Sequence, residues 1–244
     1  MKTTILPALV LLAAASSANA WIVPVNHRSG ITAEDSLNWN QFANWEWITT
    51  NNTRSASTAS GMGVALSSSG WTRRYQQGNN FFGGFAGGDA LLYQTAYPSY
   101  QRIDFAQPVQ AFTVQVSAGL GSGGNPYSGT YVANVRIYDT LNNLLADYSS
   151  PTWYMYETFS GAIVTPPVMG AFSSERNIGR IDIGVTLGGG GGSMINRVDL
   201  FIPAPGAAAI LGLGGLLAVR RRRAAWAGRP DRGAAAVNGH LLSE

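Results

Sequence analysis

The sequence has 244 residues, contains no cysteine and is only 12% charged, which is about half the proportion usual in soluble domains. The missing cysteine excludes disulfides, thiolate nucleophiles and cysteine metal sites, and the shortage of Glu, Lys and Arg argues against a helical bundle, whose surface those residues normally cover. The formal charge of +3 comes from the two ends, because residues 21–202 alone carry a charge of −2, which offers no basic surface for nucleic acid.

The first 20 residues have the three parts of a secretory signal peptide. Lys2 provides the positive charge, residues 5–15 form the apolar region, and Ala18 and Ala20 make a cleavage site of the A-x-A type. We expect signal peptidase to cleave after Ala20, which would leave Trp21 as the first residue of an exported chain.

Residues 21–202 are enough for one domain, and their pattern predicts an all-β, antiparallel β-sandwich. Apolar and polar residues alternate with the period of a strand in four runs, at positions 112–117, 132–139, 181–187 and 195–202. Clusters of glycine, asparagine and proline separate these runs. Residues 35–47 are the best candidate for a short helix.

The domain offers little for catalysis. Its single histidine, His27, lies close to the expected new N-terminus, where a solvated side chain is more common than a general base. A glycosidase needs two carboxylates that face each other across a cleft. No spacing singles out such a pair among the scattered acids, which are Asp89, Asp104, Asp139, Asp147, Asp182 and Asp199. We therefore predict no catalytic residue and no enzyme activity, with a carbohydrate-active enzyme as the alternative.

No motif requires a metal or cofactor, although the loop from Asp139 to Asn143 offers oxygen atoms of the kind that calcium binds. The loop lacks the D-x-D-x-D-G pattern, and Asp139 with Asn142 is also typical of a β-turn between two strands. We favour the turn and keep calcium as the alternative.

Aromatic side chains are the remaining functional candidates. Sugar rings stack on exposed aromatic faces, and Trp45 and Trp47 would share one face if residues 45–50 are extended. These two residues are our candidates for glycan binding. The competing interpretation, which composition favours, is that the tryptophans and their aromatic neighbours fill the core of the sandwich.

The composition changes again after residue 202. A stretch of 14 uncharged residues, 206–219, precedes the arginine cluster Arg220, Arg221, Arg222 and Arg223. Such a helix would be about 21 Å long, less than the ~30 Å hydrocarbon core of a bilayer. An apolar segment that ends in arginines nevertheless has the pattern of a membrane stop, with the arginines on the cytoplasmic side. The alternative is a helix packed on the domain.

This order of parts resembles the PEP-CTERM sorting signal of bacterial exosortase substrates: a proline motif, an apolar helix and an arginine cluster. The resemblance covers residues 203–223, and the motif is Pro203, Ala204 and Pro205, with Ala204 in place of the usual glutamate. It implies transient anchoring in the inner membrane, cleavage near the motif by an exosortase-type enzyme, and release. Residues 224–244 extend past the usual end of such proteins, and their composition predicts a disordered tail.

The domain is similar, over roughly residues 100–202, to β-sandwich domains found in proteins with this sorting signal. Residues 103–112 match an I-x-F-x-x-P-V-x-x-F pattern, with Pro108 expected in a turn and with Phe105 and Phe112 in one hydrophobic layer. The resemblance implies a jelly-roll-like sandwich, related in shape to lectins and carbohydrate-binding modules.

Together these features predict an exported, non-catalytic protein of the cell surface or the exopolysaccharide matrix, with weak glycan contact and no nucleic-acid partner. A secreted carbohydrate-active enzyme and a permanently membrane-anchored surface protein are the two alternatives.

Overall fold

The computed structural model describes residues 21–48, 53–77, 84–95, 100–118, 129–155, 165–187 and 192–203. The predicted cleavage site, the sorting-motif residues Ala204 and Pro205, the arginine cluster and the tail lie outside these ranges. Within them, no helix has the length and apolar character needed to cross a bilayer.

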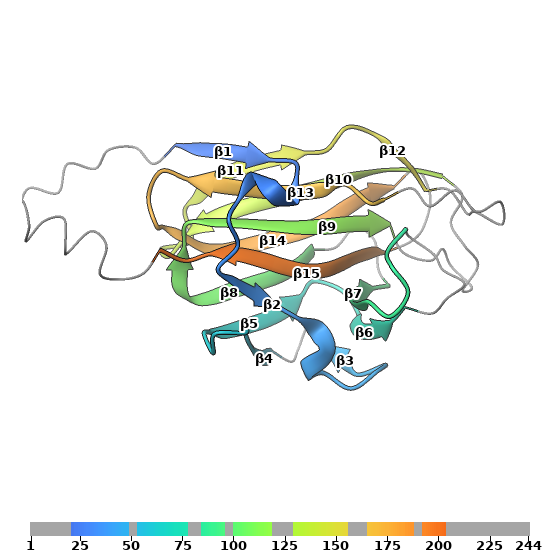
Figure 1. The fold of residues 1–244 in the computed structure, drawn as a ribbon. Helices are drawn as coiled ribbons and strands as arrows, with labels where there is room; N and C mark the ends of the chain where they lie inside the picture. Colours follow the sequence, from blue (N-terminus) through green and yellow to red (C-terminus); the bar gives the residue numbers. More distant parts are fainter. Residues whose placement is uncertain are drawn as a thin grey trace, which may run out of the picture. The chain divides into compact units, whose positions relative to one another are not determined.

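Eight strands form the first sheet, and every pairing in it is antiparallel. The order across the sheet is β1 (Ile22–Val25), β13 (Val168–Ser173), β9 (Ala111–Ala118), β15 (Ser193–Phe201), β7 (Ala90–Gln94), β6 (Thr72–Gln76) and β3 (Trp47–Ile48). The short strand β2 (Asp35–Leu37) also pairs with β15, beyond the point where β7 does. This sheet faces the viewer in Figure 1.

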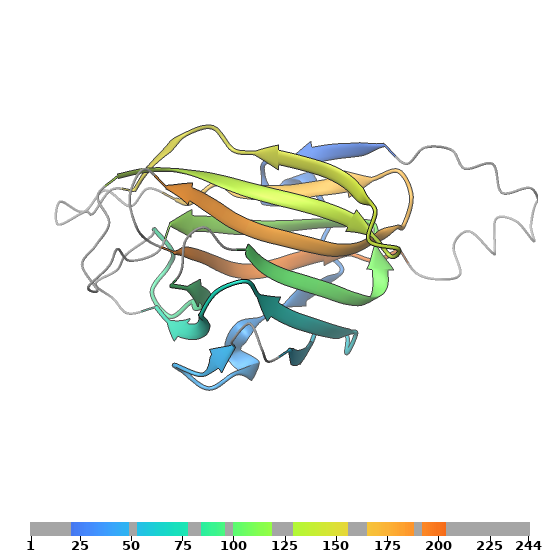
Figure 2. The same ribbon diagram turned by 180° about the vertical axis from the view of Figure 1, so that it is seen from behind.

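Seven strands form the second sheet, again with antiparallel pairings only. Its order is β11 (Leu144–Ser149), β10 (Gly129–Asp139), β14 (Ile178–Leu187), β8 (Tyr100–Val109), β5 (Gly63–Ser68) and β4 (Arg54–Ser57), with β12 (Trp153–Met155) paired to β10. It lies in front in Figure 2. The all-β, antiparallel prediction is therefore confirmed for the described residues.

One hydrophobic core lies between the two sheets. Phe105 of β8 and Phe112 of β9 both belong to it, as the sequence pattern predicted, but they reach it from opposite sheets because the chain crosses over at Gln110. Pro108 lies near the end of β8 and not in the crossover itself. Its missing N–H falls where the β8–β14 pairing is interrupted, between the pairs Ile178–Val109 and Arg180–Asp104.

The four alternating runs are all strands: three lie within β9, β10 and β14, and the fourth belongs to β15 as far as Phe201. The helix expected over residues 35–47 is wrong. That segment is β2, the 3-10 turn η2 (Trp39–Gln41) and the start of β3. The side chains of Asp35 and Asn38 accept hydrogen bonds from the N–H groups of Ser36 and Asn40, an arrangement that competes with helix formation.

Candidate functional site

The outer face of the eight-stranded sheet, turned away from the shared core, carries its own side chains. Ala90, Leu92 and Ile195 point into the core, whereas Leu91 and Met194 belong to a smaller cluster with Phe85 and Tyr93. Alternation along each strand places this second cluster on the opposite face. A strip of tryptophans around Arg73 lies on the same face, because Arg73 pairs with Tyr93 across β6 and β7. A polar pocket lies beside β15, between β9 and the start of β7.

The tryptophan strip consists of Trp45, Trp47 and Trp71 around Arg73. These three side chains are 48%, 42% and 62% exposed, far more than aromatic residues of a core. The rings of Trp47 and Trp71 meet edge to face at 5.5 Å between centroids. The Arg73 guanidinium lies 4.2 Å from the Trp45 ring centroid and 5.2 Å from that of Trp47, so it fixes both indoles by cation–π contact.

The two predicted tryptophans come together by a different route from the one expected. Only Trp47 is in a strand, and Trp45 has φ of 68°, in the left-handed region. A pair of backbone bonds supports this conformation: the Trp45 N–H donates to the Arg74 carbonyl at 2.9 Å, and the Arg74 N–H donates to the Glu46 carbonyl at 3.0 Å. The core-filling interpretation is wrong for Trp45, Trp47 and Trp71, and right for the fully buried Trp39.

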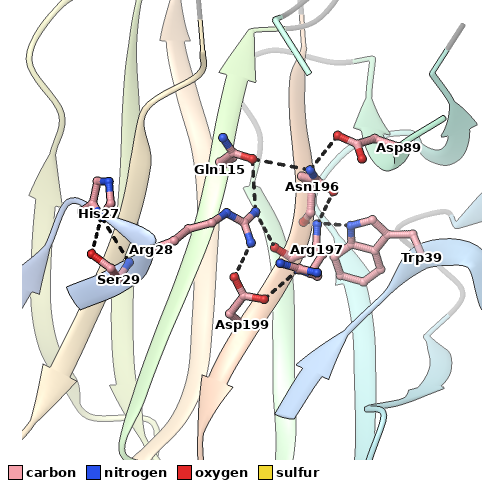
Figure 3. Close-up of polar contacts among 9 residues, drawn as sticks. All are labelled: His27, Arg28, Ser29, Trp39, Asp89, Gln115, Asn196, Arg197 and Asp199. Carbon is pink, nitrogen blue, oxygen red and sulfur yellow. Dashed lines mark hydrogen bonds and ion pairs between the residues drawn. The ribbon is translucent and has the colours of Figure 1, made fainter. Parts of the chain in front are cut away.

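The polar pocket has a volume of about 280 Å³. It is assembled from the 3-10 turns η1 (Arg28–Gly30) and η2 and from strands β7, β9 and β15, and Figure 3 shows its central contacts. Its lining residues are Arg28, Asn38, Asn40, Gly88, Asp89, Ala90, Gln115, Asn196 and Arg197. None of them was singled out from the sequence as a binding residue.

A β-bulge in β15 brings two consecutive side chains to the pocket. Ile195 pairs with Val116 and Val198 pairs with Val114, so β15 has one more residue than β9 between these two pairs. The extra residue lets Asn196 and Arg197 both line the pocket instead of pointing to opposite faces. The bulge is held from behind, because buried Trp39 donates its indole N–H to the Asn196 carbonyl at 3.0 Å.

Asp199 organises the basic side of the pocket. Its carboxylate forms ion pairs with Arg28 and, at 2.8 Å, with Nε of Arg197. Arg28 also donates to Oε1 of Gln115 at 3.2 Å. These contacts join the segment of η1 to β9 and β15 (Figure 3).

Asn196 organises the acidic side. Its amide donates to Oδ2 of Asp89 at 2.9 Å, and its Oδ1 accepts from the Arg197 N–H at 2.7 Å. The same Asp89 oxygen accepts from the backbone N–H of Ala86 at 3.1 Å. The carboxylates of Asp89, which lines the pocket, and of Asp199, which pairs with the arginines of the lining, are therefore both held by donors of the protein itself.

The other predicted candidates lie elsewhere. His27 caps η1, where its Nδ1 accepts from the Ser29 N–H at 3.2 Å, and it does not line the pocket. Asp104 and Asp182 lie on the second sheet, each directly opposite an arginine across the β8–β14 pairing. Burial raises the pKa of the Asp104 carboxyl, and nearby arginines partly offset that effect.

The loop after β10 is a turn, as favoured from its sequence. One Asp139 oxygen accepts from the backbone N–H groups of Leu141 and Asn143 at 2.8 Å each, and the other accepts from the Asn143 amide. These bonds, led by the one from the Asn143 side chain, lower the pKa of Asp139. Asn142 occupies the left-handed position of the turn. Among the described residues, no three acidic or histidine side chains gather as metal ligands.

No family model and no curated protein matches this sequence. Among solved structures, the crystal structure of a DUF4465 family protein from Bacteroides caccae is similar with a TM-score of 0.37 and 10% sequence identity. That likeness covers 73% of this chain and 99% of the other. At this level of similarity the neighbour carries no argument about function.

Proposed function

We propose that this protein is exported, is not an enzyme, and binds glycan weakly through the tryptophan strip at the cell surface or in the exopolysaccharide matrix. The observation that carries the proposal is the exposure of Trp45, Trp47 and Trp71 together on one face. Exposed indole rings leave apolar area in water, and contiguous apolar area on a protein surface marks a binding site. The C–H face of a pyranose ring is a suitable partner for such a surface.

The arrangement of the strip supports binding over a role in packing. Arg73 lies between Trp45 and Trp47, and the Trp45 ring also meets Tyr75 edge to face at 5.1 Å. Rings fixed in this way lose little side-chain entropy when a ligand covers them. Glu46, which lies between Trp45 and Trp47 in the sequence, is engaged by the Ala43 N–H and by Arg54, so its carboxylate is not a free acid beside the strip.

We also propose that the sandwich is of the jelly-roll-like type. Consecutive strands alternate between the two sheets, from β8 to β9 to β10 and again from β13 to β14 to β15. This wrapping is common to jelly rolls and to many carbohydrate-binding modules.

A glycan array with the purified protein tests the binding proposal. We expect binding to surface or matrix polysaccharides that Trp47→Ala and Trp71→Ala each weaken about tenfold, the usual cost of removing a central aromatic contact. Trp21→Ala is the matched control, because Trp21 is 59% exposed but contacts Phe172 of β13, away from the strip. Equal binding by all three variants and the parent would contradict the proposal.

The sorting proposal has a separate test. Mass spectrometry of the extracellular protein should find a C-terminus near Pro203 and no Arg220–Arg223. An extracellular or membrane form that keeps the arginines would instead favour the permanently anchored alternative.

A further inference from the structure

We propose that the polar pocket is a second binding site, which takes one neutral pyranose ring. The inference deepens the proposed glycan binding and rests on it for the class of ligand, but the pocket and the strip involve different residues and can be tested separately. Its volume of about 280 Å³ lies just below the roughly 300–1,000 Å³ typical of small-molecule sites, which suits a single ring better than a longer chain.

The charge of the pocket favours a neutral ligand. The two arginines of the lining, Arg28 and Arg197, are balanced by Asp89 in the lining and by Asp199, which pairs with both arginines but does not line the pocket itself. A sugar acid would meet Asp89, and an amino sugar would meet the arginines, so each charged ligand faces a like charge in the same small volume. A neutral ring meets neither of these two repulsions.

The hydrogen-bonding groups of the pocket match vicinal hydroxyls. Asn38 and Asn40 use their Oδ1 atoms within the protein, accepting from the Asn40 N–H at 2.7 Å and from Arg74 at 3.1 Å. Their NH₂ groups have no partner within the described ranges and line the pocket as donors. The same holds for the NH₂ group of Gln115, whose Oε1 is engaged by Arg28.

The matching acceptor is the second oxygen of Asp89. Oδ2 is engaged by Asn196 and Ala86, whereas Oδ1 has no partner in the part of the chain that the structure describes. A sugar hydroxyl both donates and accepts. A pocket with one carboxylate acceptor and several amide donors therefore satisfies two adjacent hydroxyls at once.

The fold holds these groups in place before any ligand arrives. The bulge in β15 presents Asn196 and Arg197 together, and bulges often re-aim side chains at binding sites. Arg74 also connects the pocket to the strip, because its guanidinium donates to Asn40 while its carbonyl accepts from the Trp45 N–H. The two sites are thus linked through one residue of β6.

Saturation-transfer NMR with the purified full-length protein tests the pocket directly. The probes are the methyl pyranosides of D-glucose, D-galactose and D-mannose, with D-glucuronate and D-glucosamine as charged comparators. We expect at least one neutral pyranoside to bind and both charged sugars to bind at least about tenfold more weakly. Asp89→Asn and Asn40→Ala should each weaken the neutral probe about tenfold, whereas Trp21→Ala, which lies outside both the pocket and the strip, should leave it unchanged.

Thermal unfolding of each variant establishes that it is folded, and Asp89→Asn keeps the shape of the side chain at a second position of the lining. Loss of the neutral probe in Asn40→Ala and Asp89→Asn, with parent-like binding by Trp21→Ala, supports the pocket. The proposal is overturned if no neutral pyranoside binds, if the charged sugars bind best, or if Asn40→Ala and Asp89→Asn bind the neutral probe as the parent does. In each of those cases the array result for the strip stands by itself.

Discussion

Asp35 offers the clearest test of how this fold is held together. It begins β2 in the first sheet, and its carboxylate accepts hydrogen bonds from the Ser36 N–H at 2.8 Å, the Ser60 N–H at 2.9 Å and the Ser60 hydroxyl at 2.5 Å. Ser60 lies in the turn between β4 and β5 of the second sheet. The side chain of Asp35 therefore ties the two sheets together at one edge.

The cost of removing this carboxylate follows from those bonds. A hydrogen bond to a charged group contributes about 1.5–3 kcal/mol, but Ser60 is exposed and its donors can return to water. We therefore expect Asp35→Ala to cost about 2–3 kcal/mol and not the sum of three bonds. Asp35→Asn keeps the shape and one acceptor oxygen, and should cost about 1 kcal/mol.

The contribution of the Asp35 carboxylate to the free energy of unfolding should depend on pH. Burial alone would raise the pKa of Asp35, but the hydrogen bonds from Ser60, Thr58 and Ser36 together outweigh it and lower the pKa. A carboxyl whose pKa is lower in the folded state stabilises the fold above its ordinary pKa of about 3.9, and this contribution is lost as the pH falls through the folded value.

Urea unfolding followed by tryptophan fluorescence is the assay, with the parent and Asp35→Asn compared at pH 7 and at about pH 3. The difference in free energy of unfolding should be largest at pH 7 and should shrink at the acidic end. A difference that stays constant or grows on acidification would refute the reasoning, because the carboxylate would then contribute nothing as a charged acceptor.

Three further predictions concern the strands and the pocket wall. Gly170→Ala should cost about 2–3 kcal/mol or prevent folding, because a Cβ would lie 2.3 Å from the Phe112 carbonyl oxygen; an unchanged melting temperature would contradict the β13–β9 register. Tyr148→Phe should cost about 1 kcal/mol in urea, because the Tyr148 hydroxyl donates to the Gly170 carbonyl. Burial also raises the pKa of Tyr148, so ultraviolet titration should find its hydroxyl un-ionised at pH 11, and ordinary titration would count against its burial. Trp39→Phe should lower the free energy of unfolding by about 2–3 kcal/mol, because the Asn196 carbonyl loses its donor. The same change should weaken sugar binding in the pocket. A variant that loses stability but binds sugar fully would show that the pocket does not depend on the bulge.

Strands with one buried face could be predicted because burial imposes alternation on them. The runs within β10 and β14 are examples, since every second residue of each lies in the shared core. Residues 35–47 could not be predicted in the same way. Side-chain bonds to the local backbone, and the pairing of β2 with a strand more than 150 residues away, decide that segment, and neither leaves a periodic pattern.

The strip was partly predictable and the pocket was not. Trp45 and Trp47 stand out by their spacing, and a second signal was available: Trp71, Arg73 and Tyr75 recur at every other position, which places them on one face of a strand. The strand pairing that places Trp47 opposite Arg73 cannot be predicted from the sequence. The pocket combines residues from five segments, and the bulge beside it depends on the register between β15 and β9. No local sequence pattern therefore predicts the pocket.

The position of the last strand has a consequence for the time course of folding. β15 lies between β9 and β7 in the middle of its sheet, although it comes last along the chain among the described strands. Its Asp199 forms an ion pair with Arg28 near the start of the described residues. Until residues 193–201 leave the ribosome, no strand connects β9 on one side of that sheet with β7 on the other. Such long-range closure is slow, so the first sheet should acquire stable structure only after β15 has been synthesised.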